Sequence, residues 1–215
     1  LDPAKEKDAD VRNAAWKVLT DLFPRAPTNQ LDFWNDKLRN QPSRRIVVLT
    51  ELRNRARAEG DARLVAARSQ QIGDAAFEAQ LYDDAVTAYR EALQYAIQNR
   101  LPEDLISESL LNALLRARKS NEAVNFAQTQ IARNKELGGI LLPAIRQEID
   151  RLINEVKDLP GASQLVTLAL QMNPKPLPQQ LDQLQQQAEE IQRRSKEQNL
   201  LPDGRRNGSL TASLK

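Results

Sequence analysis

The chain has 215 residues, of which 40% are apolar, enough for one or two ordinary domains or for one elongated repeat array. Its 31 basic and 29 acidic residues give a formal net charge of +2, so the overall electrostatic field does not favour binding to nucleic acid or to an anionic membrane. The sequence has neither cysteine nor histidine, which excludes disulfides, thiolate metal sites and the commonest general base. No apolar run in it is long enough to span a bilayer.

Several classes of enzyme are excluded because their motifs are missing. The sequence has no Walker loop, no Rossmann glycine pattern and no cluster of metal-ligand residues, so we expect no catalysis, no cofactor and no metal. The chain begins with Leu1 rather than methionine, so we expect a processed chain or a part of a longer one. Its compartment therefore stays open, with the cytoplasm as the default expectation and the periplasm or secretion as alternatives.

Apolar spacing predicts an all-α fold, because apolar residues recur at helical intervals and strict alternation is nearly absent. Gly60-Asp61 is typical of a helix stop followed by a helix start. Pro143 is expected to open a helix, where its missing N–H costs nothing. The predicted helices cover residues 8–22, 29–40, 43–59, 61–79, 83–99, 102–119, 121–135, 143–156 and 162–172.

The first predicted helix has an apolar face that includes Val11, Val18 and Leu22. Its sequence resembles the second helix of a HEAT repeat, in which an Asp, a Val-Arg and an Ala pair precede a Leu. The residues that carry this resemblance are Asp10, Val11, Arg12, Ala14, Ala15 and Leu19. The resemblance implies that the apolar face packs on a neighbouring helix, and it makes residues 1–60 a separate N-terminal helical segment.

Three alanines recur in the middle of the chain, each at the start of a helix that follows a turn. They are Ala85, Ala123 and Ala162, and the intervals between them are 38 and 39 residues. Each of these helices follows another apolar-striped helix, so the repeating unit is a helix–turn–helix. A fixed period in this range predicts stacked α-hairpins, in which each hairpin buries its apolar face on its neighbours.

The hairpins resemble tetratricopeptide (TPR) repeats, in which small residues let two helices approach and bulky ones fill the gap between successive hairpins. The matching positions are Ile72, Gly73, Ala85, Tyr89 and Ala92 in the first hairpin, Leu110, Leu114 and Ala123 in the second, and Ile149, Ile153, Ala162, Ala169 and Pro174 in the third. The departures are Ser69, Ala76, Ala127, Asp150 and Val166. The resemblance implies a right-handed α-solenoid with three repeats over residues 61–174, and a generic array of α-hairpins is the alternative.

A proline-rich boundary at residues 173–178 separates the repeats from a glutamine-rich helix. The apolar residues of this helix step by four and three, as in an a/d stripe of little more than two heptads: Leu177, Leu181, Leu184, Ala188 and Ile191. We expect residues 175–198 to form a helix that caps the last repeat, with a dimerising coiled coil as the alternative. Residues 199–215 are polar and contain glycine, so we expect a disordered tail.

TPR arrays bind partners mostly in the groove lined by the first helix of each hairpin, so the resemblance implies a partner-binding groove. Amide side chains there can pair with an extended peptide, and Arg116 and Arg151 can each hold a carboxylate. Gln70 and Asp74 stand where the carboxylate-clamp subtype has a Lys and an Asn, which argues against that subtype. The candidate groove residues are Gln70, Asp74, Phe77, Glu108, Asn112, Arg116, Gln147, Arg151 and Asn154.

An alternative site is the arginine-rich region from Arg39 to Arg68. Between Asp36 and Arg68 there are nine basic and four acidic residues, a local excess that attracts nucleic acid or another anionic partner. Helical spacing divides these arginines between two edges of a helix, and no aromatic platform is interleaved with them. We therefore expect a non-catalytic scaffold or adaptor that binds a protein or peptide in the groove. Nucleic acid is the alternative partner, and the oligomeric state stays open.

Overall fold

The computed structural model describes residues 3–172 and 178–200, and within those ranges every regular element is helical. This confirms the all-α prediction. The chain divides into two compact units, Leu1–Ala117 (unit 1) and Arg118–Lys215 (unit 2), and each is described by itself. None of the helices in the described ranges is both long enough and apolar enough to cross a membrane.

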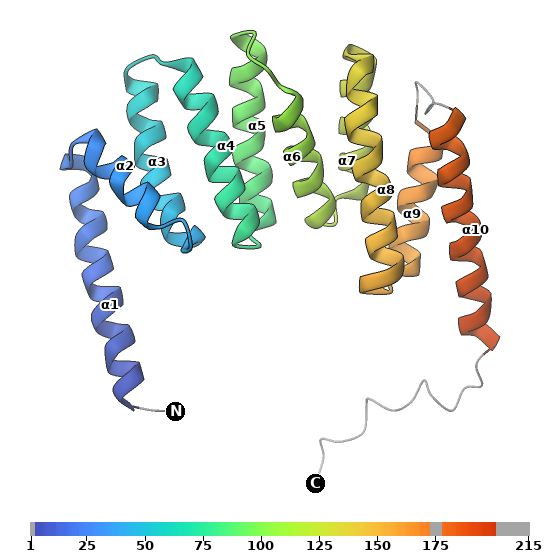
Figure 1. Cartoon of the computed structure of the whole chain (residues 1–215), viewed down its shortest axis with the longest axis horizontal. Helices are drawn as coiled ribbons and strands as arrows, with labels where there is room; N and C mark the ends of the chain where they lie inside the picture. The colour runs from blue at the N-terminus through green and yellow to red at the C-terminus, as the bar shows by residue number, and fades with distance from the viewer. Residues whose placement is uncertain (1–2, 173–177, 201–215) are drawn as a thin grey trace. The chain divides into compact units, whose positions relative to one another are not determined.

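Unit 1 consists of consecutive helices, and from α3 onward each packs on the helix that precedes it (Figure 1). Its elements are α1 (Pro3–Leu22), the short 3-10 turn η1 (Phe23–Arg25), α2 (Thr28–Lys37), α3 (Pro42–Ala58), α4 (Ala62–Glu78), α5 (Tyr82–Gln98) and α6 (Asp104–Arg116). Helix α4 also contacts α6. Since α5 runs back between them, α4 and α6 run in the same direction.

Three successive turns of unit 1 are built alike, at intervals of 20 residues. Helices α3, α4 and α5 each have 17 residues, and each is followed by a residue in the left-handed region, namely Gly60 (φ 72°), Gln80 (φ 61°) and Arg100 (φ 54°). The amide after each of these residues donates to a carbonyl five residues back, which ends the helix as in a Schellman motif. Asp61 then caps α4 by accepting from the Leu64 amide at 2.9 Å, so the predicted stop and start at Gly60-Asp61 is confirmed.

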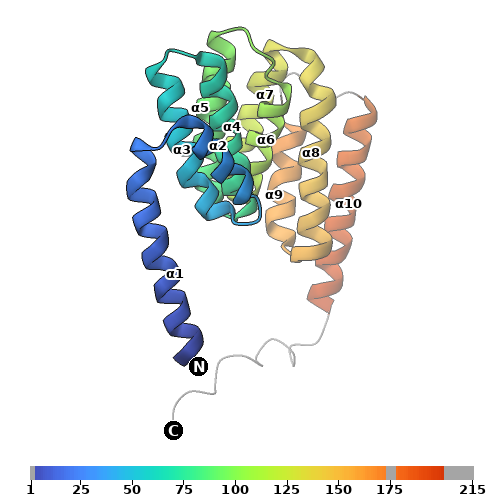
Figure 2. The same cartoon turned by 60° about the vertical axis from the view of Figure 1, so that its left-hand side comes forward.

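Helix α1 meets the rest of unit 1 only near its C-terminal end, and the remainder projects away (Figures 1 and 2). Trp16 and Leu19 pack against the core of unit 1, and the Trp16 ring lies edge-on to Phe23 at 5.8 Å and beneath the Arg44 guanidinium at 5.1 Å. The apolar face predicted for this helix is largely exposed, with Val11 and Val18 each 63% exposed. The part of the chain that the structure describes therefore supplies little cover for that face.

Unit 2 contains α7 (Ser120–Arg133), the 3-10 turn η2 (Lys135–Leu137), α8 (Gly138–Arg151), the π-helical turn η3 (Leu152–Val156), α9 (Leu159–Leu170) and α10 (Pro178–Leu200). Helices α7, α8 and α9 contact one another in pairs, and α10 packs on α9 and α8. Leu184 and Ile191 of α10 are 1% and 4% exposed, so the predicted a/d stripe is used inside unit 2. Leu177, Pro174 and most of the predicted tail, residues 201–215, lie outside the described residues.

The prediction that Pro143 opens a helix is wrong. Helix α8 begins at Gly138, five residues earlier, and Pro143 lies inside it. A proline there lacks the N–H that would bond the carbonyl four residues back, which belongs to Gly139. Both Gly139 and Pro143 are exposed, so water can bind that carbonyl and the helix continues.

The three recurring alanines occupy the same place in their helices. Ala85, Ala123 and Ala162 are each the fourth residue of α5, α7 and α9, and each is 0% exposed. In the first hairpin, Gly73 of α4 lies directly against the ring of Tyr89 on α5, because a Cβ added to Gly73 would lie 2.5 Å from Tyr89 Cε1. In this hairpin a glycine thus lies where α4 and α5 approach closely.

Candidate functional site

The six groove residues predicted in unit 1 lie on the surface of two neighbouring helices, α4 and α6. All six are half-buried: Gln70, Asp74, Phe77, Glu108, Asn112 and Arg116. These two helices are in contact and run in the same direction. We call this surface the α4–α6 face, and it is defined by these six residues.

The centre of the α4–α6 face is a hydrogen bond between a carboxylate and a buried phenol. The Tyr89 hydroxyl donates to Asp74 Oδ1 at 2.7 Å, and Tyr89 is only 3% exposed. Burial raises the pKa of Asp74, and neighbouring Glu78 raises it further, while Tyr89 and Arg45 act in the opposite direction. The pKa of Tyr89 is raised as well, first by burial and then by the Asp74 carboxylate. The face therefore holds a negative charge that is poorly solvated.

Sequence reasoning identified Asp74 but not the side chains that surround it. The repeat pattern gives Tyr89 only a packing role, yet its hydroxyl lies under the face and also interacts with Ser109 of α6. Arg45 of α3 donates to Asn35 of α2 at 2.9 Å and contributes a positive charge near Asp74. Tyr89, Ser109 and Arg45 come from three other helices, α5, α6 and α3, so spacing along the sequence gives no signal for them.

Replacement of Asp74 by asparagine is expected to stabilise the protein at neutral pH. A raised pKa means that the folded state holds the proton more tightly, so wild-type stability falls as pH rises above 3.8, the usual pKa of an aspartate, and through the raised pKa. Asparagine keeps an acceptor for Tyr89 and cannot ionise. We expect Asp74→Asn to gain about 0.5–1 kcal/mol at pH 7, after allowance for solvent screening.

The measurement for this prediction is urea unfolding of both proteins across the acid and neutral range. The gain should vanish below the usual aspartate pKa of 3.8, where both side chains are neutral. Asp10→Asn is the matched control, because Asp10 is exposed and its replacement removes the same charge in solvent. A variant that is less stable than wild type at pH 7 would show that the Asp74 charge is favourably paired.

The arginines of the alternative site are used mainly inside unit 1. Arg53 and Arg57 of α3 both bind Glu91 of α5, and Arg68 of α4 binds Asp32 of α2 at 2.8 Å. Arg55 pairs with Glu51 and donates to the Phe23 carbonyl, and Arg45 donates to Asn35. Arg44 lies over the Trp16 ring, and Arg39 pairs with Asp36. These guanidinium groups hold the helices together, so the region offers less charge to an anionic partner than its composition implies.

The three groove residues predicted in unit 2 differ from those in unit 1 in their exposure and in their hydrogen-bond partners. Gln147 and Asn154 are exposed. Arg151 already holds a carboxylate, since its Nε and Nη2 donate to Glu148 at 2.7 and 2.5 Å. Glu148 is 6% exposed, and the pair lies within one turn of α8. The bidentate contact expected of Arg151 therefore exists, but its partner is its own neighbour.

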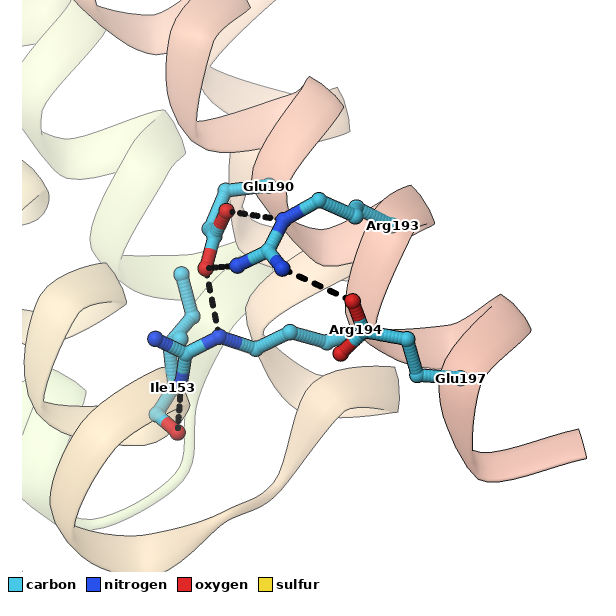
Figure 3. A network of polar contacts seen from close by, with 5 residues as sticks. All are labelled: Ile153, Glu190, Arg193, Arg194 and Glu197. Atoms are coloured by element: carbon cyan, nitrogen blue, oxygen red, sulfur yellow. Dashed lines mark hydrogen bonds and ion pairs between the residues drawn. The ribbon is translucent and has the colours of Figure 1, made fainter. Parts of the chain in front are cut away.

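Unit 2 also has an open pocket of about 310 Å³ between α8, η3 and α10. Its walls are polar, and several of their groups fasten α10: Gln187 Nε2 donates to Asp150 Oδ1 at 2.7 Å, and Arg194 Nη1 donates to the Ile153 carbonyl at 3.3 Å. Arg193 and Arg194 both donate to Glu190, which lowers the pKa of Glu190 to about 2 (Figure 3). The contacts of Gln187 and Arg194 thus hold α10 against α8 and η3.

Comparisons with protein-family models and with curated proteins give no match for this chain. The interpretation of the α4–α6 face therefore rests on its own geometry. That geometry combines amides, carboxylates, an arginine and a half-buried phenylalanine on two parallel helices. Such a surface offers hydrogen bonds, charge and apolar contact together, as recognition of a polypeptide requires.

Proposed function

We propose that unit 1 is a short right-handed α-solenoid of TPR-like hairpins. The proposal is supported by the contact of Gly73 with the Tyr89 ring, because a glycine against a large aromatic is the pairing expected of this repeat. It is also supported by the buried Ala85 at the start of α5 and by the consecutive packing of α2 to α6. Solenoids of this kind present one row of helices as an extended binding surface.

We infer that the protein is a non-catalytic scaffold or adaptor, and that the α4–α6 face holds a segment of a partner protein. The observation that carries this inference is the α4–α6 face, where half-buried amides, carboxylates and a phenylalanine lie on two neighbouring helices and Asp74 accepts from the Tyr89 hydroxyl at 2.7 Å. Amides and carboxylates on a helix face are the groups that pair with the backbone and side chains of a bound segment. The proposal also includes three residues of unit 2, Gln147, Arg151 and Asn154. They give it less support, because Arg151 is bound to Glu148.

The test is selection of ligands from a random peptide library displayed on phage, with the full chain as the target. Affinities of the recovered peptides are then measured by fluorescence anisotropy. We expect Gln70→Ala/Asn112→Ala to weaken binding by about tenfold, since each amide can make two hydrogen bonds to a peptide backbone.

The matched control is Gln94→Ala/Gln98→Ala, which removes two exposed amides from α5 instead. We expect this variant to bind as wild type does. Recovery of no peptide, or equal losses in the two variants, would contradict the proposed function. Circular dichroism of each variant checks that the helices are intact.

A further inference from the structure

Two side chains in the wall of the unit 2 pocket each have a buried polar atom without a hydrogen-bond partner among the described residues. These atoms are Nε of Arg146, on α8, and Oε1 of Gln187, on α10. Buried donors and acceptors are nearly always paired, and an unpaired one costs stability. Both atoms belong to long side chains that face the pocket, so a small turn of these side chains brings the atoms to a ligand there.

The unpaired end of Gln187 is its oxygen, because both contacts of this side chain require the amide nitrogen. Gln187 Nε2 donates to the Arg146 carbonyl at 3.2 Å and to Asp150 Oδ1 at 2.7 Å. Both partners are acceptors, so an exchange of the amide oxygen and nitrogen would lose both bonds. The pocket therefore offers one unpaired donor, which is cationic, and one unpaired acceptor, which is neutral.

The other charges in the wall are matched by their neighbours or lie against a neutral group. Glu190 accepts from Arg193 and Arg194, and these contacts neutralise it (Figure 3). Asp150 is exposed, and the bond that its Oδ1 accepts comes from the neutral amide of Gln187. Charge for a ligand is thus supplied by a cation and an anion that lie one turn apart on α8, Arg146 and Asp150.

Other arginines of unit 2 show what kind of group fits Arg146. Arg151 holds Glu148, and Arg193 holds Glu190, each through the edge formed by Nε and Nη2. Such a two-point contact with a carboxylate is among the strongest that a guanidinium makes. The same edge of Arg146 has no acceptor at Nε. A carboxylate is therefore the expected partner of Arg146.

Asp150 and Gln187 favour a group of the opposite kind. The Asp150 carboxylate and Gln187 Oε1 are both acceptors, and an ammonium group supplies three donors together with a positive charge. A ligand that carries a carboxylate and an ammonium a few bonds apart therefore matches all three side chains. The pocket volume of about 310 Å³ is at the low end for ligand sites, which restricts the ligand to a small molecule.

The backbone beside the pocket has a conformation that is frequent at functional sites. Ile153 and Asn154 lie in the wall and belong to η3, which is a π-helical turn. Such turns are rare, and many of those known occur at functional sites. In this one the Ile153 carbonyl accepts from Arg194 Nη1 at 3.3 Å, so the turn is fastened to α10 across the pocket.

We propose that this pocket binds a small α-amino acid, with its carboxylate on Arg146 and its ammonium group between Asp150 and Gln187 Oε1. The inference does not depend on the peptide binding proposed above, because no residue of the α4–α6 face lies in the pocket wall. It gives unit 2 a small-molecule ligand of its own.

The experiment is isothermal titration calorimetry of the full chain with each of the common amino acids. We expect at least one of them to bind with millimolar affinity or better. The comparison probes are the amine and the acid that each lack one of its two charged groups, which for alanine are ethylamine and propionate. We expect both to bind about tenfold more weakly or worse, because each loses one set of charge-assisted hydrogen bonds.

Variants of the full chain test the assigned positions. Arg146→Gln should weaken binding of the amino acid by about tenfold or more. Asp150→Asn should weaken it as well, since it removes the charge and keeps an acceptor for Gln187, and it serves as the test if Arg146→Gln does not fold. The matched control is Arg63→Gln, at an exposed position of α4 outside the pocket, which should bind as wild type does.

Three results would overturn the proposal. The first is that none of the amino acids binds, which would mean that the pocket takes water alone. The second is that ethylamine or propionate binds as tightly as the amino acid does. The third is that a folded Arg146→Gln protein, or Asp150→Asn in its place, keeps the affinity of wild type.

Discussion

Gly73→Ala is expected to destabilise the protein by about 2 kcal/mol, because it forces a methyl group into the ring of Tyr89. The added Cβ would lie 2.5, 2.6 and 2.9 Å from three ring carbons, closer than van der Waals contact allows. The ring cannot move aside easily, since Tyr89 is 3% exposed and its hydroxyl is bonded to Asp74. The higher helix propensity of alanine, worth up to about 1 kcal/mol, offsets only part of the loss.

Urea unfolding of the single and double variants tests this cause directly. If the clash is with the ring, Gly73→Ala should cost much less in a Tyr89→Leu background, so the two changes will not be additive. Gly139→Ala is the control, because nothing lies within 4 Å of its added Cβ and it should be neutral or stabilising. A Gly73→Ala protein as stable as wild type would mean that α4 and α5 do not approach as described.

Glu91→Ala is expected to cost about 2–3 kcal/mol, because it leaves three donors without their acceptor. The carboxylate of Glu91 on α5 accepts from Arg53 at 2.8 Å, from Arg57, and from the Ser69 hydroxyl at 2.8 Å. Ser69 is 0% exposed, so its hydroxyl would lose its partner in a place that excludes water. The carboxylate thus joins α3, α4 and α5.

Thermal or urea unfolding measures the loss, and two further variants separate its parts. Glu91→Gln keeps an acceptor for Ser69 and loses the charge, so it should fall between wild type and Glu91→Ala. Asp36→Ala removes a pair whose side chains are 72% and 64% exposed, so its effect should stay within about 0.5 kcal/mol. Similar losses for Asp36→Ala and Glu91→Ala would show that the buried network adds nothing.

The Glu91 network also explains why Ser69 departs from the repeat pattern. TPR repeats place a bulky residue at this position, where this chain has a serine. In the structure its small side chain leaves room for the Glu91 carboxylate, which is reached by arginines from α3. Ser69 and the arginines of α3 therefore take part in one interaction through Glu91, which lies 22 residues from Ser69 and 38 from Arg53 in the sequence.

Helix positions could be predicted from the sequence because the signals for them are local. Apolar spacing located the helices, and Gly60-Asp61 marked a boundary through a backbone angle and a cap that involve neighbouring residues. The recurring alanines located buried positions, since Ala85, Ala123 and Ala162 are each 0% exposed. The helix start predicted at Pro143 was wrong, because a helix tolerates a proline where the freed carbonyl is exposed to solvent. That exposure cannot be seen in the sequence.

The sequence by itself determined the helical class and the turns that end α3, α4 and α5. Only the tertiary structure decided which charges on those helices are satisfied. The arginines of α3 are bound to Glu91, whereas Asp74 accepts from a neutral hydroxyl, and both outcomes depend on side chains from other helices. Periodicity fixes the direction of a side chain around its own helix, but its solvation and its pKa depend on what the neighbouring helices bring to it.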